Sequence, residues 1–169
     1  MKKFILLLSV ITFTILSSCS GEDGAPGKNG KDALISEVFE LQNVNFGNTG
    51  NGYKIFQNLS PNIYASDVIL IYRKTDVLPN GNPVWRSIPR TLYLPQGELD
   101  YDFDFSKQDF TIYAGGTYDL ALTPAYITNQ TFRIVIVPGA FSNRLRKDMT
   151  YEEVIAKYNI KDKNVKVLN

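Results

Sequence analysis

Residues 99–105 read LDYDFDF, and apolar and acidic residues alternate strictly along this stretch. An extended strand points successive side chains to opposite faces of a sheet. One face would therefore carry Leu99, Tyr101, Phe103 and Phe105, and the other would carry Asp100, Asp102 and Asp104. A period of two is typical of a half-buried β-strand, so the stretch predicts β structure with a hydrophobic core on one side.

Strand-length segments continue in both directions from this stretch. They are predicted at residues 34–46, 53–59, 67–73, 84–86, 91–94, 110–113, 118–122, 131–137 and 164–168. Turn residues separate them: GNTGNG (47–52) predicts a hairpin between the first two segments, and PNGNP (79–83) predicts a second hairpin. The run DVILIYR (67–73) is apolar almost throughout, which indicates a central strand covered on both faces.

One short helix is predicted near the C-terminus. Thr150 and Glu153 have the spacing of a capping box, and Asn159 is a suitable end. A helix beginning there would carry one apolar stripe, made of Tyr151, Val154, Ile155 and Tyr158. We expect this stripe to close one end or face of the sheets, with a partner-binding role as the alternative. The predicted fold is an all-β antiparallel sandwich, jelly-roll or immunoglobulin-like, with one C-terminal helix.

The N-terminal residues have the pattern of an export signal. Two lysines precede a mainly apolar run within residues 1–18, which is too short to span a bilayer comfortably as a permanent helix. The sequence LSSC (16–19) resembles a bacterial lipobox. This resemblance implies cleavage between Ser18 and Cys19 and acylation of Cys19, and the acyl chains would anchor the protein in a membrane. The alternative is a secreted protein with an unpaired cysteine.

Residues 19–32 follow the predicted cleavage point and contain glycine at every third position from Gly21 to Gly30. The segment lacks apolar periodicity and cannot bury a core, so it is predicted to be a tether to one domain at residues 33–169. The triplets are collagen-like, because a collagen helix admits only glycine at each third place. We expect four triplets to be too few to trimerise alone, so a trimer would need help from the β domain.

Composition excludes several kinds of chemistry. The chain has no histidine and one cysteine, so thiol catalysis, zinc binding and a histidine general base are not expected. Its 169 residues carry a formal net charge of +1, and removal of residues 1–18 lowers this to about −1. No basic surplus points to nucleic acid. The predicted mature chain of 151 residues is the size of one domain.

Three further features are candidate sites. Asp100, Asp102 and Asp104 would share a face and could bind calcium, or could simply be a solvated strand face. Together with Asp109 they are also the carboxylates on which a carbohydrate-directed enzyme would depend. Trp85 and Arg86 follow the second predicted hairpin and are candidates for ligand contact, although core packing of Trp85 is the favoured interpretation. No other cofactor is expected.

The order of these parts resembles a group of Bacteroidota lipoproteins with a lipobox, a glycine-triplet run and one β-rich domain. The resemblance extends through SEVFELQNVNF, SDVILIYR, LDYDFDFSKQDFTIYAGGTYDL, TFRIVIVPGAF and TYEEVIAKYNI. It implies an outer-membrane lipoprotein, on the cell surface or on the periplasmic face, and implies no particular activity. Glu22 and Asp23 resemble the acidic surface-export signal of that phylum.

The expected function is therefore a lipid-anchored, non-catalytic binding module with a protein or glycan ligand. Two alternatives stay open at this stage. One is a stalked head that assembles as a trimer through the glycine triplets, and the other is the carbohydrate-directed enzyme that uses aspartate carboxylates.

Overall fold

The computed structural model describes residues 36–48, 50, 52–139, 149–160, 162 and 165–168. The chain divides into two units, Met1–Lys31 and Asp32–Asn169, and all described residues belong to the second. The predicted signal peptide (residues 1–18), Cys19, the acidic pair Glu22 and Asp23, and the predicted tether (residues 19–32) lie outside the described residues.

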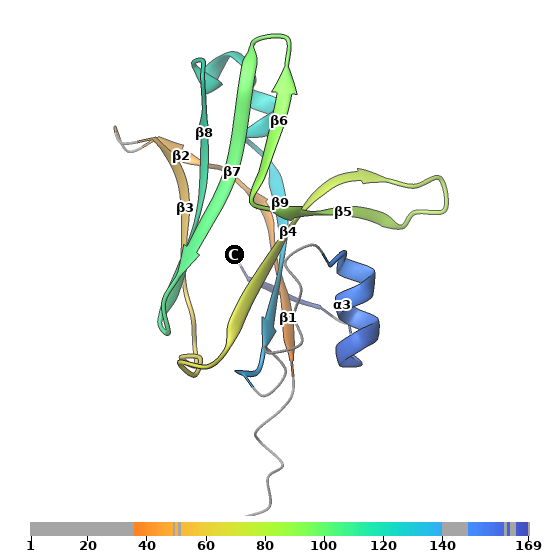
Figure 1. Cartoon of the computed structure of the whole chain (residues 1–169). Helices are drawn as coiled ribbons and strands as arrows, with labels where there is room; N and C mark the ends of the chain where they lie inside the picture. The colour runs from red at the N-terminus through yellow and green to blue at the C-terminus, as the bar shows by residue number, and fades with distance from the viewer. Residues whose placement is uncertain are drawn as a thin grey trace, which may run out of the picture. The chain divides into compact units, whose positions relative to one another are not determined.

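The second unit contains two five-stranded sheets that face each other (Figure 1). Sheet A has the order β10-β1-β9-β4-β5, formed by Lys166–Leu168, Glu37–Val44, Gln130–Val137, Val68–Val77 and Pro83–Ile88. Sheet B has the order β2-β3-β8-β7-β6, formed by Gly47–Asn48, Tyr53–Asn58, Asp109–Gly116, Gly97–Phe105 and Arg90–Leu94. Neighbouring strands are antiparallel except β10, which runs parallel to β1. The predicted antiparallel β-sandwich with a C-terminal helix is confirmed.

The main core lies between the two sheets. Strands β4 and β9 in sheet A and β7 and β8 in sheet B each contribute every second residue to it, as their alternation requires. Members from these four strands are Ile69, Ile71, Phe132, Ile134, Ile136, Leu99, Tyr101, Phe110, Ile112 and Ala114. Each large apolar side chain buried in this way contributes about 1.5–3 kcal/mol.

Helix α3 (Tyr151–Tyr158) covers the outer face of sheet A (Figure 1). A second buried cluster, here called the outer cluster, joins the helix to strands β4, β5 and β9; it consists of Tyr72, Trp85, Val135, Val137, Met149, Tyr151, Val154 and Ile160. Sheet A is therefore covered on both faces, as its apolar run at residues 67–73 predicted. The prediction that the helical stripe closes one face of the sandwich is also confirmed.

Both ends of α3 follow the predicted signals. The Thr150 hydroxyl accepts a hydrogen bond from the Glu153 backbone N–H at 3.2 Å, and the Glu153 carboxylate accepts one from the Thr150 N–H at 2.8 Å. Asn159 ends the helix in the left-handed conformation, at φ 50°.

Replacing the N-cap residue of α3 should loosen this helix. We expect Thr150→Ala to cost about 1 kcal/mol, because the N–H of Glu153 loses its acceptor. Hydrogen exchange should show the loss first in the amides of residues 151–158. Equal loss of protection in β7 and β8 would contradict a local effect.

Strands β4 and β5 continue beyond the sandwich as a projecting hairpin (Figure 1). Residues 74–82, here called the arm, are all exposed, and its tip contains Val77 and Leu78 at 46% and 47% exposure. Gly81 has φ +87°, a conformation that the turn requires and that side chains other than glycine rarely adopt. The predicted hairpin at PNGNP is confirmed.

Two predicted features are wrong. Residues 34–46 and 53–59 do not form one hairpin: β1 joins sheet A, and only the two-residue β2 pairs with β3 in sheet B. Residues 118–122 are not a strand, because Asp119 caps a 3-10 turn, η1 (Leu120–Leu122), that is followed by a second one, η2 (Pro124–Tyr126).

Candidate functional site: a groove between the arm and helix α3

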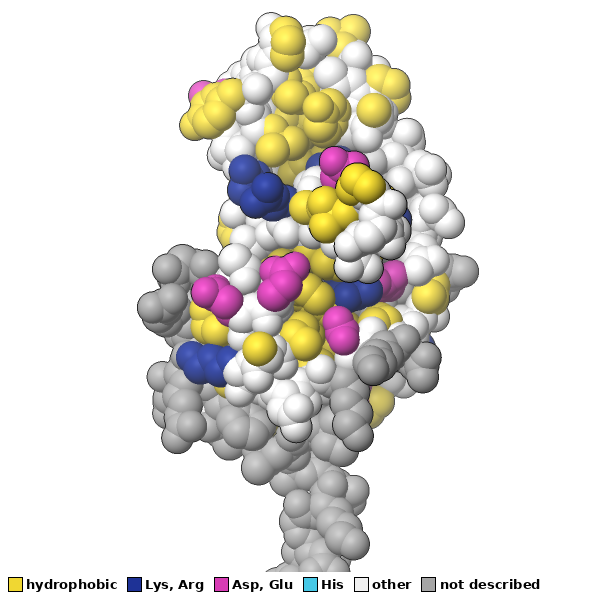
Figure 2. Space-filling view, turned by 90° about the vertical axis from the view of Figure 1, so that its right-hand side faces the viewer, with side chains coloured by type: hydrophobic (Ala, Val, Ile, Leu, Met, Phe, Trp, Pro, Cys, Tyr) yellow, Lys and Arg dark blue, Asp and Glu magenta, His cyan; other side chains and the backbone are white. Residues whose placement is uncertain are grey.

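A groove of about 490 Å³ lies between helix α3 and the part of the β4–β5 hairpin from Asn82 to Trp85. This volume falls within the range of small-molecule and cofactor sites. Figure 2 looks onto this side of the molecule, where acidic side chains lie among hydrophobic ones. The groove is lined by Asn82, Pro83, Trp85, Arg133, Tyr151, Glu152, Ile155, Ala156 and Asp162.

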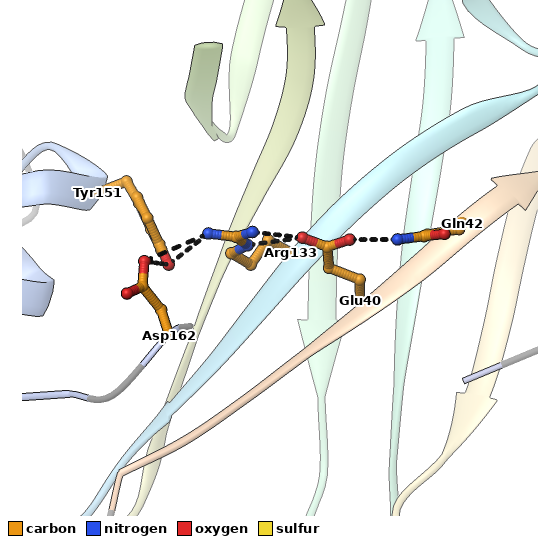
Figure 3. Close-up of polar contacts among 5 residues, drawn as sticks. All are labelled: Glu40, Gln42, Arg133, Tyr151 and Asp162. Atoms are coloured by element: carbon orange, nitrogen blue, oxygen red, sulfur yellow. Dashed lines mark hydrogen bonds and ion pairs between the residues drawn. The ribbon is translucent and has the colours of Figure 1, made fainter. Parts of the chain in front are cut away.

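Arg133 is the centre of the polar contacts in the groove (Figure 3). It lies on β9 directly opposite Glu40 on β1, and its Nε donates to the Glu40 carboxylate at 2.8 Å. Its Nη1 donates to the Tyr151 hydroxyl at 2.6 Å and lies 3.5 Å from Asp162. The Tyr151 hydroxyl in turn donates to Asp162 at 2.8 Å. Gln42 donates to the second oxygen of Glu40 at 2.6 Å.

Two aromatic rings cover the guanidinium of Arg133. Its central carbon lies 4.3 Å from the centroid of the Trp85 ring and 4.9 Å from that of Tyr151. The Arg133 and Glu40 side chains are only 11% and 9% exposed. A buried cation is tolerated when it is both paired and hydrogen-bonded, and this one also gains from the π faces. The network therefore fastens α3 and Asp162 to the centre of sheet A.

Burial in these clusters raises the pKa of three tyrosine hydroxyls. The pKa of Tyr151 is raised chiefly by desolvation and then by its hydrogen bond to Asp162, while Arg133 lowers it. Desolvation also raises the pKa of Tyr72, and it raises that of Tyr101 to about 12. The protonated phenol is therefore the form that the folded state favours at all three positions.

Stability should consequently fall in alkaline solution. Unfolded phenols ionise near pH 10, so the contribution of these tyrosines is complete below that pH and is lost as pH rises, for Tyr101 toward about 12. We expect a loss of about 1.4 kcal/mol per pH unit for each tyrosine. Urea unfolding at pH values below and above 10 measures this loss of stability. Tyr101→Phe should make the loss shallower, and Tyr93→Phe, at a residue that is 80% exposed, should not.

Trp85 and Arg86, the predicted ligand contacts, point to opposite faces of β5. Trp85 is only 8% exposed, so it packs in the outer cluster and also lines the groove. Arg86 is exposed and pairs with Arg73 on the other face of the hairpin. The structure thus brings Trp85 to the groove and separates Arg86 from it.

The acidic residues of β7 lie on the outer face of sheet B. Leu99 and Tyr101 are buried and Asp102 and Asp104 are exposed, as the predicted alternation requires. Asp100 is half-buried, however, and Phe105, at the end of the strand, is 41% exposed. Asp104 accepts a hydrogen bond from the Tyr113 hydroxyl at 2.8 Å. No group of three or more carboxylates among the described residues has the geometry of a metal site.

Asp109 is the first residue of β8 and follows the turn at the end of the acidic row. Its carboxylate accepts a hydrogen bond from the Ser106 hydroxyl at 2.7 Å in the turn between β7 and β8. The carboxylates named as enzyme candidates therefore lie on sheet B and its turn, and none of them lines the groove on sheet A.

Sequence reasoning did not identify Arg133, Glu40 or Asp162 as site residues. A usable signal was present, because Arg133 is the only charged residue of TFRIVIV and therefore requires a buried partner. Glu40 interrupts the apolar run of β1 in the same way. Asp162 carries no such signal in its charged C-terminal surroundings.

The described residues thus define a β-sandwich with one helix-covered face and a groove beside that helix. Comparison of the chain with protein-family models, curated proteins and solved structures gives no match. None of the helices in the described part of the chain is long and apolar enough to cross a membrane.

Proposed function

We propose that this protein is a lipid-anchored outer-membrane lipoprotein whose β-sandwich is a non-catalytic binding module. The groove between the arm and α3 is its ligand site. The observation that carries the binding role is this groove of about 490 Å³, with an aromatic-covered Arg133 in its lining. The anchor rests on the export signal, the lipobox pattern before Cys19 and the resemblance to Bacteroidota lipoproteins.

The anchoring part is tested by changing the lipidated residue. Cells that produce the Cys19→Ala chain should incorporate no labelled fatty acid into it and should release it from the membrane fraction. Ser20→Ala is the matched control and should behave as the unchanged chain. Membrane retention of the Cys19→Ala chain would contradict lipid anchoring.

The side of the membrane is tested separately. If Glu22 and Asp23 act as a surface-export signal, protease added to intact cells should cleave the unchanged protein. The double variant Glu22→Ala, Asp23→Ala should be protected in intact cells and cleaved after lysis. Equal cleavage of both chains in intact cells would assign surface export to another signal.

The binding part is tested by filling the groove. Ala156 is exposed on α3 and lines the groove, so Ala156→Trp should block it without entering the core. The matched control is Ala121→Trp, at an exposed position on η1. Envelope components retained by the immobilised protein should be lost with the first variant and kept with the second. Identical retention by all three chains would refute the groove as the ligand site.

A further inference from the structure

The positive charge of the groove is already engaged by the protein. Arg133 places Nε and Nη2 against Glu40 and Nη1 against Tyr151 and Asp162. Two aromatic rings also lie against its guanidinium, since the centroids of Trp85 and Tyr151 are 4.3 and 4.9 Å from its central carbon. An incoming anion would have to displace buried partners to reach it. Arg133 is therefore a structural cation and a poor receptor for a carboxylate or phosphate.

Among the described residues that line the groove, negative charge is in excess. Arg133 is the only cation among the described residues that line it, and Glu40 beneath it balances that charge. Glu152 is exposed on the first turn of α3, and the Asp162 side chain is one-third exposed, so both carboxylates face the space that a ligand would occupy. Lys74 pairs with Trp85 across the arm but does not line the groove.

The rest of the lining is suited to an aliphatic stem. Pro83 and the Trp85 ring form the arm side, and Ile155 and Ala156 form the helix side. Lysine and arginine side chains bury their methylenes against apolar surface while their charged ends stay near water or a carboxylate. Asn82, in the turn of the arm, adds a hydrogen-bonding amide to the rim.

We propose that the groove binds a lysine or arginine side chain presented by a protein partner. The stem lies between Pro83 and Ile155, and the cation lies against Glu152 and Asp162. This inference rests on the proposed function, because it names the ligand class of the same groove. Charge complementarity selects the occupant. Glu152 and Asp162 give the described lining a net negative charge, although Asp162 is also paired with Arg133, and this charge attracts a cation and opposes an acidic segment.

The test uses the full chain in a non-ionic detergent and three blocked tripeptides: Gly-Lys-Gly, Gly-norleucine-Gly and Gly-Glu-Gly. Trp85 is the only tryptophan in the chain and lines the groove, so its fluorescence reports binding there directly. We expect the lysine peptide to change the emission and to bind about tenfold more tightly than the norleucine peptide. We expect no saturable change with the glutamate peptide.

Two carboxylate variants, one in the groove and one control on sheet B, test the contribution of charge to binding. Glu152→Gln should weaken binding of the lysine peptide about fivefold, since a charge pair at 4 Å contributes about 1 kcal/mol in water. Glu98→Gln removes another exposed carboxylate, on sheet B, and should change nothing. Added salt should weaken the lysine peptide and leave the norleucine peptide unaffected.

The possible results distinguish an error in the proposed ligand class from an error in the proposed binding site. Equal binding of the lysine and norleucine peptides, or preference for the glutamate peptide, would overturn the inference and leave the groove as a binding site. An unchanged Trp85 signal with all three peptides would also overturn it. The proposed function fails on a different result, namely identical envelope retention by the Ala156→Trp chain.

Discussion

Arg133→Met should reduce the free energy of unfolding by about 3–5 kcal/mol, because it leaves the Glu40 carboxylate buried without its cation. Methionine fills much of the same volume but offers no donor to Glu40 or Tyr151. Glu40 is only 7% exposed, so little water reaches its carboxylate to replace the lost partner. Domains are commonly stable by only 5–15 kcal/mol, so the loss is a large fraction of the total.

Urea unfolding measures this loss, and two variants identify its cause. The double variant Glu40→Met, Arg133→Met removes both charges, so it should recover at least half of the stability lost by the single change. Lys54→Met removes an exposed cation on sheet B and should change stability by less than about 0.5 kcal/mol. If the double variant is as unstable as Arg133→Met, the unpaired Glu40 charge is not the cause.

The sequence predicted which faces of the strands are buried much better than which strands are neighbours. Alternation in LDYDFDF correctly placed Leu99 and Tyr101 in the core, since the period depends only on local backbone geometry. The error at residues 34–59 concerns pairing. The turn after Gly47 exists, but the partner of β1 is β9, about ninety residues further along the chain. Alternation alone does not specify a partner strand at that separation.

Residues 118–122 were predicted to be a strand, but a local hydrogen bond favours a 3-10 turn there. Tyr118, Leu120 and Leu122 have the period of a strand, yet Leu120 is 3% exposed and Leu122 is 68% exposed. The Asp119 carboxylate accepts a hydrogen bond from the Ala121 N–H, which favours a turn over an extended chain. Pro124 then begins the second turn, where its missing N–H is not needed.

Only part of the groove could be predicted from the sequence. Trp85 stood out because it is the single tryptophan and follows a turn, but the alternatives of core and ligand contact could not be separated, and the structure combines them. Arg133 and Asp162 come from segments with no local relation to Trp85. These three residues come together only because α3 lies over sheet A. The apolar stripe of the helix predicted that the helix covers one end or face of the sandwich, but it did not predict which one.

Phe132→Ala should cost about 3–5 kcal/mol, which is comparable with the effect at its neighbour Arg133 but has a different origin. Phe132 is fully buried on β9, and its ring meets those of Phe46 and Tyr101 edge-on, with centroids 5.8 and 6.4 Å away. Alanine would leave a cavity between the sheets and remove both ring contacts. Phe56→Ala is the control, because that ring is 55% exposed on sheet B and should cost far less.

The two variants of β9 should be separable by the fluorescence of Trp85. Phe132 and Arg133 are consecutive, so one side chain enters the main core and the other contacts Trp85 and Tyr151 of the outer cluster. Arg133→Met removes the cation from the face of Trp85 and should change the emission of the folded protein. Phe132→Ala should lower stability in urea unfolding but leave the native emission unchanged. A native emission change with Phe132→Ala would mean that the two faces of sheet A are coupled through β9, so a ligand in the groove would also alter packing between the sheets.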